Sequence, residues 1–233
     1  LREAILPALL GRSVEEIEGN CRTVQNALQG NTSAKAAAEI ALYDLHAQAA
    51  GLPLYQVLGG GSPVLSTDIT ISVNDTQTML ADCEAALARG FTALKIKVGK
   101  ELDGDYQRLH AIRDAVAGRA QLRIDANQGW TAAHTLAVLG RLEAEAGGFD
   151  LIEQPVPAAD FNGMQEIKAA GLLTPLMADE SAFSLPQVAN LLTHNAADII
   201  NIKLMKTGGL SQALAITELC RQQHVPCLMG CML

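Results

Sequence analysis

Short apolar runs alternate with amphipathic segments along most of the chain after residue 65. Each apolar run predicts a buried strand, and each segment that follows predicts a helix bounded by Gly, Pro or a capping residue. The predicted strands end near residues that lie 23 to 28 positions apart: Asn74, Lys97, Asp125, Glu153, Asp179, Lys203 and Gly230. This repeat predicts a parallel TIM-like (β/α) barrel, which one further strand would close. An open doubly wound sheet is disfavoured, because no Gly-rich phosphate turn follows the first strand.

The first 60 residues predict helices without intervening strands. Ala34–Ala50, for example, is rich in alanine, carries Ile40 and Leu45 on roughly one side, and ends at Gly51. We therefore predict a separate helical part at residues 1–62 and a barrel domain at residues 63–233.

Both ends of the sequence predict that it is part of a longer protein. It begins with Leu1 instead of Met, and Met232 and Leu233 end it inside an apolar run. Seven strands would leave two barrel edges unpaired, so we expect these 233 residues alone to be inactive and poorly soluble.

Three acidic residues occupy the same position in three successive strand–helix units. Asp125, Glu153 and Asp179 each follow a predicted strand, at intervals of 28 and 26 residues. In a closed barrel the three carboxylates would meet, where they would repel one another unless a cation compensated their charge. Oxygen-only ligands suit Mg²⁺, or Mn²⁺, better than zinc. Any one acid could simply cap the next helix, but three in register favour the metal site.

Period-two alternation predicts lysines inside the barrel. Lys95 and Lys97 share one face of their strand, and the opposite face is apolar and suited to packing against helices. Asn201 and Lys203 point inward in the same way on the sixth strand. Among the acids, the pKa of such a lysine can fall toward the range useful for general acid–base chemistry. Lys206 lies outside the alternation and is interpreted as a solvated loop residue.

The second and sixth strands lie across a barrel from each other. A substrate bound between them would present one face to Lys97 and the other to Lys203. That arrangement suits removal of a proton from carbon on one face and its return on the other. A divalent metal would stabilise the enolate formed from a carboxylate substrate.

Charge and composition argue against several classes of protein. The net charge of −8 at pH 7, with no basic patch, argues against a nucleic-acid partner. No run of 18 apolar residues predicts a membrane span. The five cysteines are odd in number and form no CxxC pair, so we expect reduced thiols and a cytoplasmic location.

Five motifs, taken in order, resemble those of the enolase superfamily. They are Lys95-Ile96-Lys97, Asp125-Ala126-Asn127, Glu153-Gln154-Pro155, Asp179-Glu180-Ser181 and Asn201-Ile202-Lys203. Within it the chain is similar to the muconate-lactonising subgroup, whose capping-domain helices resemble the segments 41–45, 51–55 and 58–60. The segments 71–74, 95–99, 124–130, 177–181, 200–209 and 230–232 most resemble dipeptide epimerases of the L-Ala-D/L-Glu type.

The resemblance implies a (β/α)7β TIM-like barrel, incomplete at the C-terminus, with a partial α+β capping domain at the N-terminus. It implies a metal-dependent epimerase that acts on a small carboxylate or dipeptide, such as L-Ala-L/D-Glu, and we expect a homo-oligomer. Its implied site residues fall into four groups. They are the Mg²⁺ ligands Asp125, Glu153 and Asp179; the acid/base pair Lys97 and Lys203, with Lys95 as electrostatic neighbour; the pocket residues Thr70, Cys231 and Leu233; and the supporting residues Asn127, Glu180 and Asn201.

Three other functions remain open from the sequence. A lyase or cycloisomerase, of the muconate cycloisomerase or o-succinylbenzoate synthase type, would use the same metal and lysines. In the family, an Asp-x-Asp on the last strand pairs with the ammonium group of the dipeptide, and it would distinguish an epimerase from a lyase or cycloisomerase. That strand is not in the sequence. The family's mobile N-terminal loop is not in the sequence either. A Schiff-base aldolase, with one lysine attacking a carbonyl, is disfavoured by the clustered acids. A non-catalytic barrel is disfavoured because no expected ligand is replaced.

Overall fold

The computed structural model describes residues 1–61, 64–99 and 102–232. Its helices are α1 (Ile5–Leu9), α2 (Ile17–Asn26), α3 (Thr32–Ala49), α4 (Leu54–Val57), α5 (Thr76–Ala88), α6 (Leu102–Val116), α7 (Ala132–Ala146), α8 (Phe161–Ala169), α9 (Leu185–Thr193), α10 (Leu204–Thr207) and α11 (Leu210–Gln222). Its strands are β1 (Ile69–Ile71), β2 (Ala93–Lys97), β3 (Gln121–Asp125), β4 (Leu151–Glu153), β5 (Leu176–Ala178), β6 (Ile199–Ile202) and β7 (Cys227–Met229).

The chain forms two compact units. Unit 1 contains Leu1–Leu65, Phe183–Val188 and Asn201–Leu233, and unit 2 contains Ser66–Ala182 and Ala189–Ile200. Because unit 1 groups segments from both ends of the chain, the division into domains at residues 1–62 and 63–233 stays a prediction.

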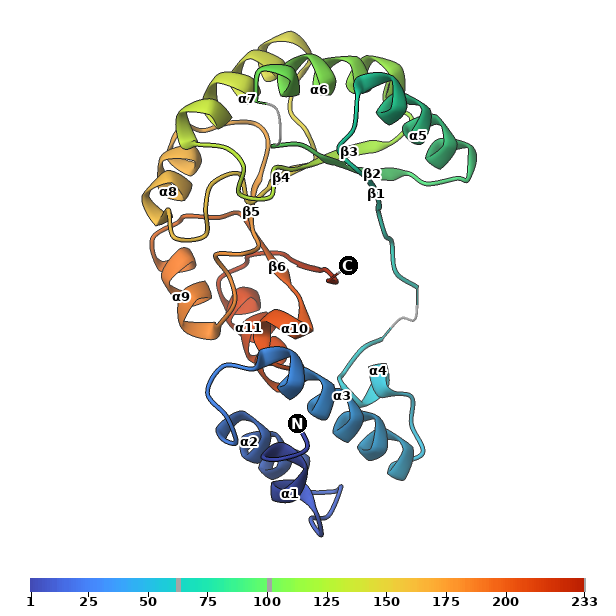
Figure 1. Cartoon of the computed structure of the whole chain (residues 1–233), viewed down its shortest axis with the longest axis vertical. Coiled ribbons are helices and arrows are strands. Elements are labelled where there is room, and N and C mark those ends of the chain that lie inside the picture. The colour runs from blue at the N-terminus through green and yellow to red at the C-terminus, as the bar shows by residue number, and fades with distance from the viewer. Residues whose placement is uncertain (62–63, 100–101, 233) are drawn as a thin grey trace. The chain divides into compact units, whose positions relative to one another are not determined.

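The strands of the described chain form one sheet in sequential order, from β1 to β7. The pairings from β1 to β6 are parallel. In unit 2, helices α5 to α8 lie on one side of strands β1 to β5 (Figure 1). The strand–helix repeat and the barrel type of fold predicted from the sequence are therefore confirmed, although β1 ends at Ile71, before its predicted end near Asn74.

The side chains that face the helices of unit 2 form its core. Leu94, Ile96, Ile124, Ile152 and Ile200 lie on four of the strands, and each is completely buried. Burying one such side chain contributes roughly 1.5–3 kcal/mol to stability. This apolar face fixes the register of the strands, because a slip by one residue would turn every side chain to the other face.

Short polar side chains begin the helices of unit 2. The carboxylate of Asp75 accepts a hydrogen bond from the backbone amide of Thr78 at the start of α5. Thr131 does the same at the start of α7, and Asp160 at the start of α8. Each cap satisfies an amide that has no partner within its helix, which contributes about 1 kcal/mol. β1, β3 and β4 therefore pass into their helices through loops that end in a defined cap.

The N-terminal helices of unit 1 pack around a small apolar cluster. Ile5, Val24 and Ala38, from α1, α2 and α3, are buried together. In the same unit, the amide of Gly230 after β7 donates to the carbonyl of Ile202 on β6, at 2.8 Å. No helix of the described chain has both the length and the apolar character needed to cross a membrane.

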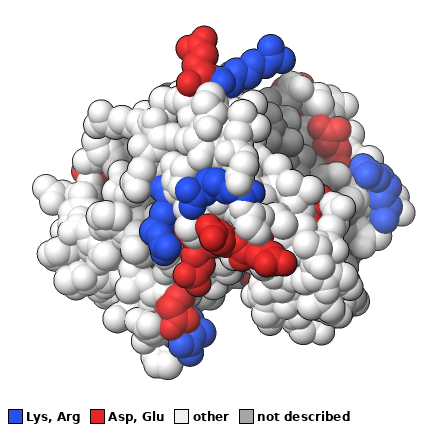
Figure 2. Space-filling model, turned by 90° about the horizontal axis from the view of Figure 1, so that it is seen from below, with Lys and Arg blue, Asp and Glu red and all other residues white. Residues whose placement is uncertain are grey.

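On the face shown in Figure 2, most of the atoms belong to uncharged residues. Acidic and basic side chains form small groups of both signs there. Charged residues make up 18% of the sequence, which is consistent with this sparse distribution.

Candidate functional site

Three charged residues stand in one row across neighbouring strands of unit 2. Lys97 on β2 is the register partner of Asp125 on β3, and Asp125 is the register partner of Glu153 on β4. Asp179 follows β5, two residues beyond Met177, the register partner of Glu153. Because partners in register share a face of the sheet, the carboxyl ends of β2, β3 and β4 present these side chains together.

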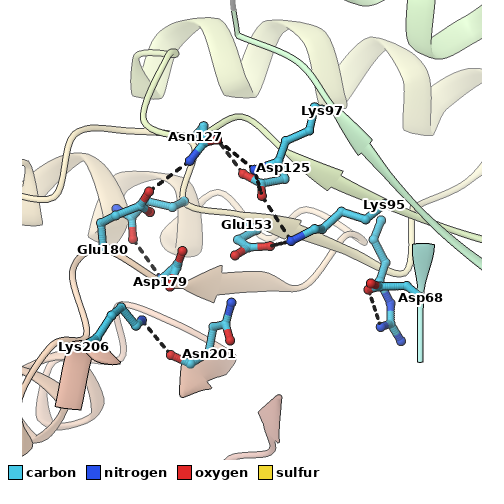
Figure 3. Close-up of polar contacts among 12 residues, drawn as sticks. Asp68, Lys95, Lys97, Asp125, Asn127, Glu153, Asp179, Glu180, Asn201 and Lys206 are labelled. Atoms are coloured by element: carbon cyan, nitrogen blue, oxygen red, sulfur yellow. Dashed lines mark hydrogen bonds and ion pairs between the residues drawn. The ribbon is translucent and has the colours of Figure 1, made fainter. Parts of the chain in front are cut away.

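The three acids are buried, with exposed fractions of 2% for Asp125, 1% for Glu153 and 2% for Asp179. Lysines partly compensate their charge (Figure 3). Nζ of Lys97 contacts Oδ2 of Asp125 at 2.6 Å, and Nζ of Lys95 lies 3.4 Å from the same oxygen. Lys95 also donates to Oε2 of Glu153 at 3.2 Å. The prediction that Lys95 and Lys97 share a face with the acids is therefore confirmed within unit 2.

The acids raise the pKa of Lys95. Burial lowers this pKa, but the negative charges of Glu153 and Asp125 and the hydrogen bond to Glu153 outweigh that effect, and the net shift is upward. The sequence predicted that a lysine pKa could fall in this cluster. That expectation is wrong for Lys95 here, because the carboxylates favour the charged ammonium more than burial disfavours it.

Asn127 links three parts of this site. Its side-chain oxygen accepts a hydrogen bond of 2.8 Å from Lys97, and its side-chain nitrogen donates to Glu180 at 3.0 Å. Its backbone amide donates to Oδ1 of Asp125 at 3.0 Å. Asn127 has a left-handed backbone, with φ of 47°, which asparagine tolerates better than most residues. Asn127 and Glu180 therefore contact the site within unit 2, and their supporting role stays a prediction.

Gln154 supports the acids in a way that the sequence reasoning missed. It is completely buried, and its side-chain oxygen accepts hydrogen bonds from the backbone amides of Asp179 (2.9 Å) and Ser181 (3.1 Å). Its side-chain nitrogen donates to the carbonyl of Val156 at 2.9 Å and to Oγ of Ser181 at 2.8 Å. The residue next to Glu153 thus holds the loop that carries Asp179. A buried amide directly after an acid, before Pro155, was the available signal.

A second support, also missed, joins the loops after β2 and β3. Asp105 is completely buried and accepts hydrogen bonds of 2.9 Å from the backbone amide of Gly99 and from Nε1 of Trp130. Arg108 pairs with its other oxygen at 2.5 Å. A Cβ at Gly99 would collide with the backbone of Ala126, so only glycine allows this close approach. The loops that follow Lys97 and Asp125 are therefore joined.

The remaining predicted polar residues belong to unit 1. Asn201 is buried on β6, and Lys203 follows the strand and directly precedes α10. The interpretation of Lys206 as a solvated residue is wrong: it is 2% exposed, and its Nζ donates to the carbonyl of Asn201 at 2.8 Å. It also lies 5.6 Å from the centre of the Phe183 ring. The cause is α10, which begins directly after the strand and turns this side chain back toward β6.

The predicted pocket residues are placed as follows. Thr70 on β1 is the register partner of Lys95, so it shares a face with the lysines. Cys231 follows β7 in unit 1 and is exposed. Leu233 lies outside the described residues.

In their chemistry the buried acids fit a divalent cation, because they supply oxygen donors alone at the ends of β3, β4 and β5. Within the described residues, no group of three His, Cys, Asp or Glu side chains is arranged as a ready metal site. Lys95 and Lys97 contact oxygens of Asp125 and Glu153.

Comparisons with known proteins identify similar chains. The chain is 44% identical to the L-Ala-D/L-Glu epimerase of Bacillus subtilis over 234 residues, covering 100% of this chain and 64% of that protein. A structure of a substrate-liganded complex of the B. subtilis L-Ala-D/L-Glu epimerase has a TM-score of 0.96 at 45% identity, covering 99% and 64%. A dipeptide epimerase from Cytophaga hutchinsonii, in complex with Mg and the dipeptide D-Ala-L-Val, has a TM-score of 0.91 at 36% identity, covering 98% and 62%. The chain thus spans less than two thirds of the length of these relatives.

Family comparisons cover nearly the whole chain. Residues 1–59 match the N-terminal domain of the mandelate racemase/muconate lactonizing enzyme family. Residues 78–233 match the family described as enolase C-terminal domain-like. The chain belongs to the enolase superfamily, with N- and C-terminal domains of the mandelate racemase/muconate lactonizing enzyme type.

Proposed function

We propose that the protein is a metal-dependent epimerase that removes and returns the α-proton of a small carboxylate substrate, a dipeptide such as L-Ala-L/D-Glu. The observation that carries the proposal is the row of Lys97, Asp125 and Glu153, in which a half-buried lysine lies beside two buried acids at the ends of parallel strands. Two of the similar proteins are named as an L-Ala-D/L-Glu epimerase and a dipeptide epimerase, and these names support the substrate class.

Asp125, Glu153 and Asp179 are the proposed ligands of Mg²⁺, with Mn²⁺ as the alternative. When bound, such a cation stabilises negative charge that develops on the substrate carboxylate. The chain's own contribution is to keep the donors buried and fixed. Gln154 holds the loop of Asp179, and Asn127 holds Asp125 through its backbone amide.

Lys97 and Lys203 are the proposed acid and base, one for each face of the α-carbon. A single base can only return a proton to the face from which it came, so inversion requires a second group on the other face. Lys95 remains charged beside Glu153 and Asp125, and we assign it an electrostatic role. Asn127 orients Nζ of Lys97 through its hydrogen bond of 2.8 Å.

Isotope exchange in D₂O tests the two-base assignment in the intact protein. Lys97→Ala and Lys203→Ala should each abolish epimerisation, because each removes the base on one face. Each variant should still wash deuterium into only one epimer of the dipeptide, and the two variants should label opposite epimers. The matched control is Lys168→Ala, which removes a lysine paired with Asp198 at 3.0 Å outside the site and should leave both rates unchanged.

Other outcomes of this experiment contradict the proposal. If both lysine variants label the same epimer, or if either still epimerises at the wild-type rate, the two-base assignment is wrong. An elimination or cycloisomerisation product without the complementary labelling would indicate a lyase or cycloisomerase. Trapping of a lysine adduct by borohydride would indicate a Schiff-base enzyme. The cytoplasmic location and the homo-oligomeric state stay predictions from the sequence.

A further inference from the structure

Glu39 is a buried acid of unit 1 that the proposed mechanism does not use. It lies on α3, and its side chain is completely buried. Oε2 accepts a hydrogen bond of 2.8 Å from the backbone amide of Ser211, and Oε1 accepts one of 2.7 Å from the Ser211 hydroxyl. Oε1 also accepts a hydrogen bond of 2.7 Å from Nε2 of Gln25 on α2. Such charge-assisted hydrogen bonds are about twice as strong as neutral ones.

These contacts hold the turn between α10 and α11. Ser211 lies in the first turn of α11, where free amides and the helix dipole favour a negative group. Gln25 donates a second hydrogen bond of 2.8 Å, to the carbonyl of Gly208. Gly209 has a φ of 130°, and a Cβ at this position would collide with the carboxylate of Glu39. The acid is therefore packed directly against the two-glycine turn.

Only the short helix α10 separates this turn from Lys203. The carbonyl of Lys203 accepts hydrogen bonds from the amides of Lys206 (2.9 Å) and Thr207 (3.1 Å). The carbonyl of Leu204 accepts hydrogen bonds of 3.0 Å from the amides of Gly208 and Gly209. The backbone of Lys203 is thus hydrogen-bonded to a helix whose far end Glu39 and Gln25 hold.

We propose that Glu39, a residue of the N-terminal helices, is a positioning residue for Lys203. Glu39 fixes the turn after α10 and thereby the helix that starts directly after Lys203. The backbone position of Lys203, from which its side chain reaches the substrate proton, is fixed in turn. The inference rests on the proposed function, in which Lys203 serves one face of the substrate. The inference predicts that a change at Glu39 slows proton exchange on the Lys203 face of the substrate alone.

Glu39→Gln is a sharp test because it keeps the shape of the side chain. If the new amide oxygen accepts from the Ser211 amide, the new NH₂ group must face Gln25. Gln25 must then turn its own oxygen toward residue 39, which removes its hydrogen bond to Gly208. In the opposite orientation two donors, the new NH₂ group and the Ser211 amide, face each other. In either orientation one hydrogen bond to the turn is lost, while the volume of the side chain at position 39 hardly changes.

The expected result is an asymmetric loss of isotope exchange in the intact protein. The epimer that Lys97→Ala still labels is the one that Lys203 serves. In Glu39→Gln, α-proton exchange of that epimer should fall at least about tenfold, since small displacements of a reacting group are costly. Exchange of the other epimer, served by Lys97, should stay within about twofold by the same argument.

Glu143→Gln is the matched control. Glu143 on α7 also accepts hydrogen bonds from two backbone amides and a hydroxyl, those of Leu173 (2.9 Å) and Thr174 (2.8 and 2.6 Å). The segment that Glu143 holds, Leu173 and Thr174, precedes β5 and carries neither proposed base. This variant should change the two exchange rates by the same factor. A loss of exchange in Glu39→Gln that is equal for both epimers would contradict the positioning role, because general destabilisation has that effect.

Amide hydrogen exchange measured by mass spectrometry tests directly, without turnover, whether Glu39 stabilises the turn between α10 and α11. Segment 204–211 should exchange faster in Glu39→Gln than in the parent or in Glu143→Gln, and unchanged protection would overturn the inference. If Glu39→Gln does not fold, Ser211→Ala removes only the hydroxyl contact and should show the same asymmetry at a smaller size. A symmetric loss there would overturn the inference as well. Failure of Lys97→Ala and Lys203→Ala to label opposite epimers would instead overturn the proposed function.

Discussion

The side-chain oxygen of Gln154 accepts a hydrogen bond of 2.9 Å from the backbone amide of Asp179. The residue that follows one acid therefore fixes the position of the next acid. Two buried amides depend on this oxygen, since Ser181 donates to it as well. Leaving a buried amide without an acceptor costs about 1–3 kcal/mol.

Gln154→Ala should therefore impair both stability and the metal site. We expect the free energy of unfolding to fall by about 2–4 kcal/mol, from lost hydrogen bonds and the cavity left behind. We expect the Mg²⁺ affinity to fall about 10- to 100-fold, as for other residues that support metal ligands. Urea denaturation and calorimetric titration measure the two effects. The control is Gln128→Ala, where a half-buried glutamine accepts one backbone hydrogen bond of 2.8 Å from Ala158; an equal loss of Mg²⁺ affinity there would contradict the assignment.

Removal of metal should abolish turnover, and added Mg²⁺ or Mn²⁺ should restore it. Glu153→Gln removes one ligand charge and should weaken Mg²⁺ binding at least about 100-fold, beyond the range of supporting residues. Glu166→Gln, on the exposed side of α8, should bind Mg²⁺ like the parent. Titration calorimetry gives the affinities directly. Full activity in excess EDTA would remove the basis for this site.

Gly99→Ala should destabilise the protein more than Gly118→Ala does. Both glycines have a positive φ, of 96° and 74°, so each substitution carries a strain of about 1–2 kcal/mol. Only at Gly99 would the new Cβ collide with backbone, that of Ala126, whereas the space at Gly118 is open. We expect about 1–3 kcal/mol of additional loss at Gly99 from overpacking. Equal midpoints of urea unfolding for the two variants would show that the loops do not approach so closely.

Stability should fall as the pH rises from 9 to about 11, in part because of Cys83. Burial, with the charges of Asp82 and Glu84, raises the pKa of this thiol from 9.0 to about 11. Below pH 9 the thiol is protonated in both states. Between the two values the unfolded chain releases the proton while the folded chain keeps it, which favours unfolding.

Cys83→Ala removes this titration, so its free energy of unfolding should fall less across the same pH window. The difference from the parent should reach up to about 2 kcal/mol. Cys231→Ala, which removes an exposed thiol, should follow the parent curve. Denaturation curves at pH 9, 10 and 11 provide the comparison. Parallel curves for the parent and Cys83→Ala would mean that this thiol ionises equally in both states.

Local periodicity was enough to predict part of the site. Lys95 and Lys97 alternate with buried apolar residues, and a strand with one apolar face has a single possible orientation. The acids at strand ends followed from the repeat of strands and helices, since parallel strands end at one edge of the sheet. The roles of the acids as metal ligands and of the lysines as bases stay predictions.

The errors and omissions arose where the backbone leaves its regular repeat. Lys206 was misplaced because α10 begins right after Lys203, so a helical repeat and not an alternating one sets its direction. Gln154 was missed because its orientation depends on a left-handed backbone, with φ of 35°. It also depends on a partner, Ser181, that lies 27 residues away. No local sequence pattern encodes such a contact.

Trp130 is the single tryptophan of the chain, and its indole nitrogen donates to Asp105, which also binds the backbone of Gly99. The ring is 2% exposed. Its fluorescence therefore reports on the separation of the loops that follow Lys97 and Asp125, without an attached label. Stopped-flow mixing with Mg²⁺ or with a dipeptide can follow the arrival of each at this edge of the sheet in real time, so the chain carries an intrinsic optical probe in the loop after one of its proposed metal ligands.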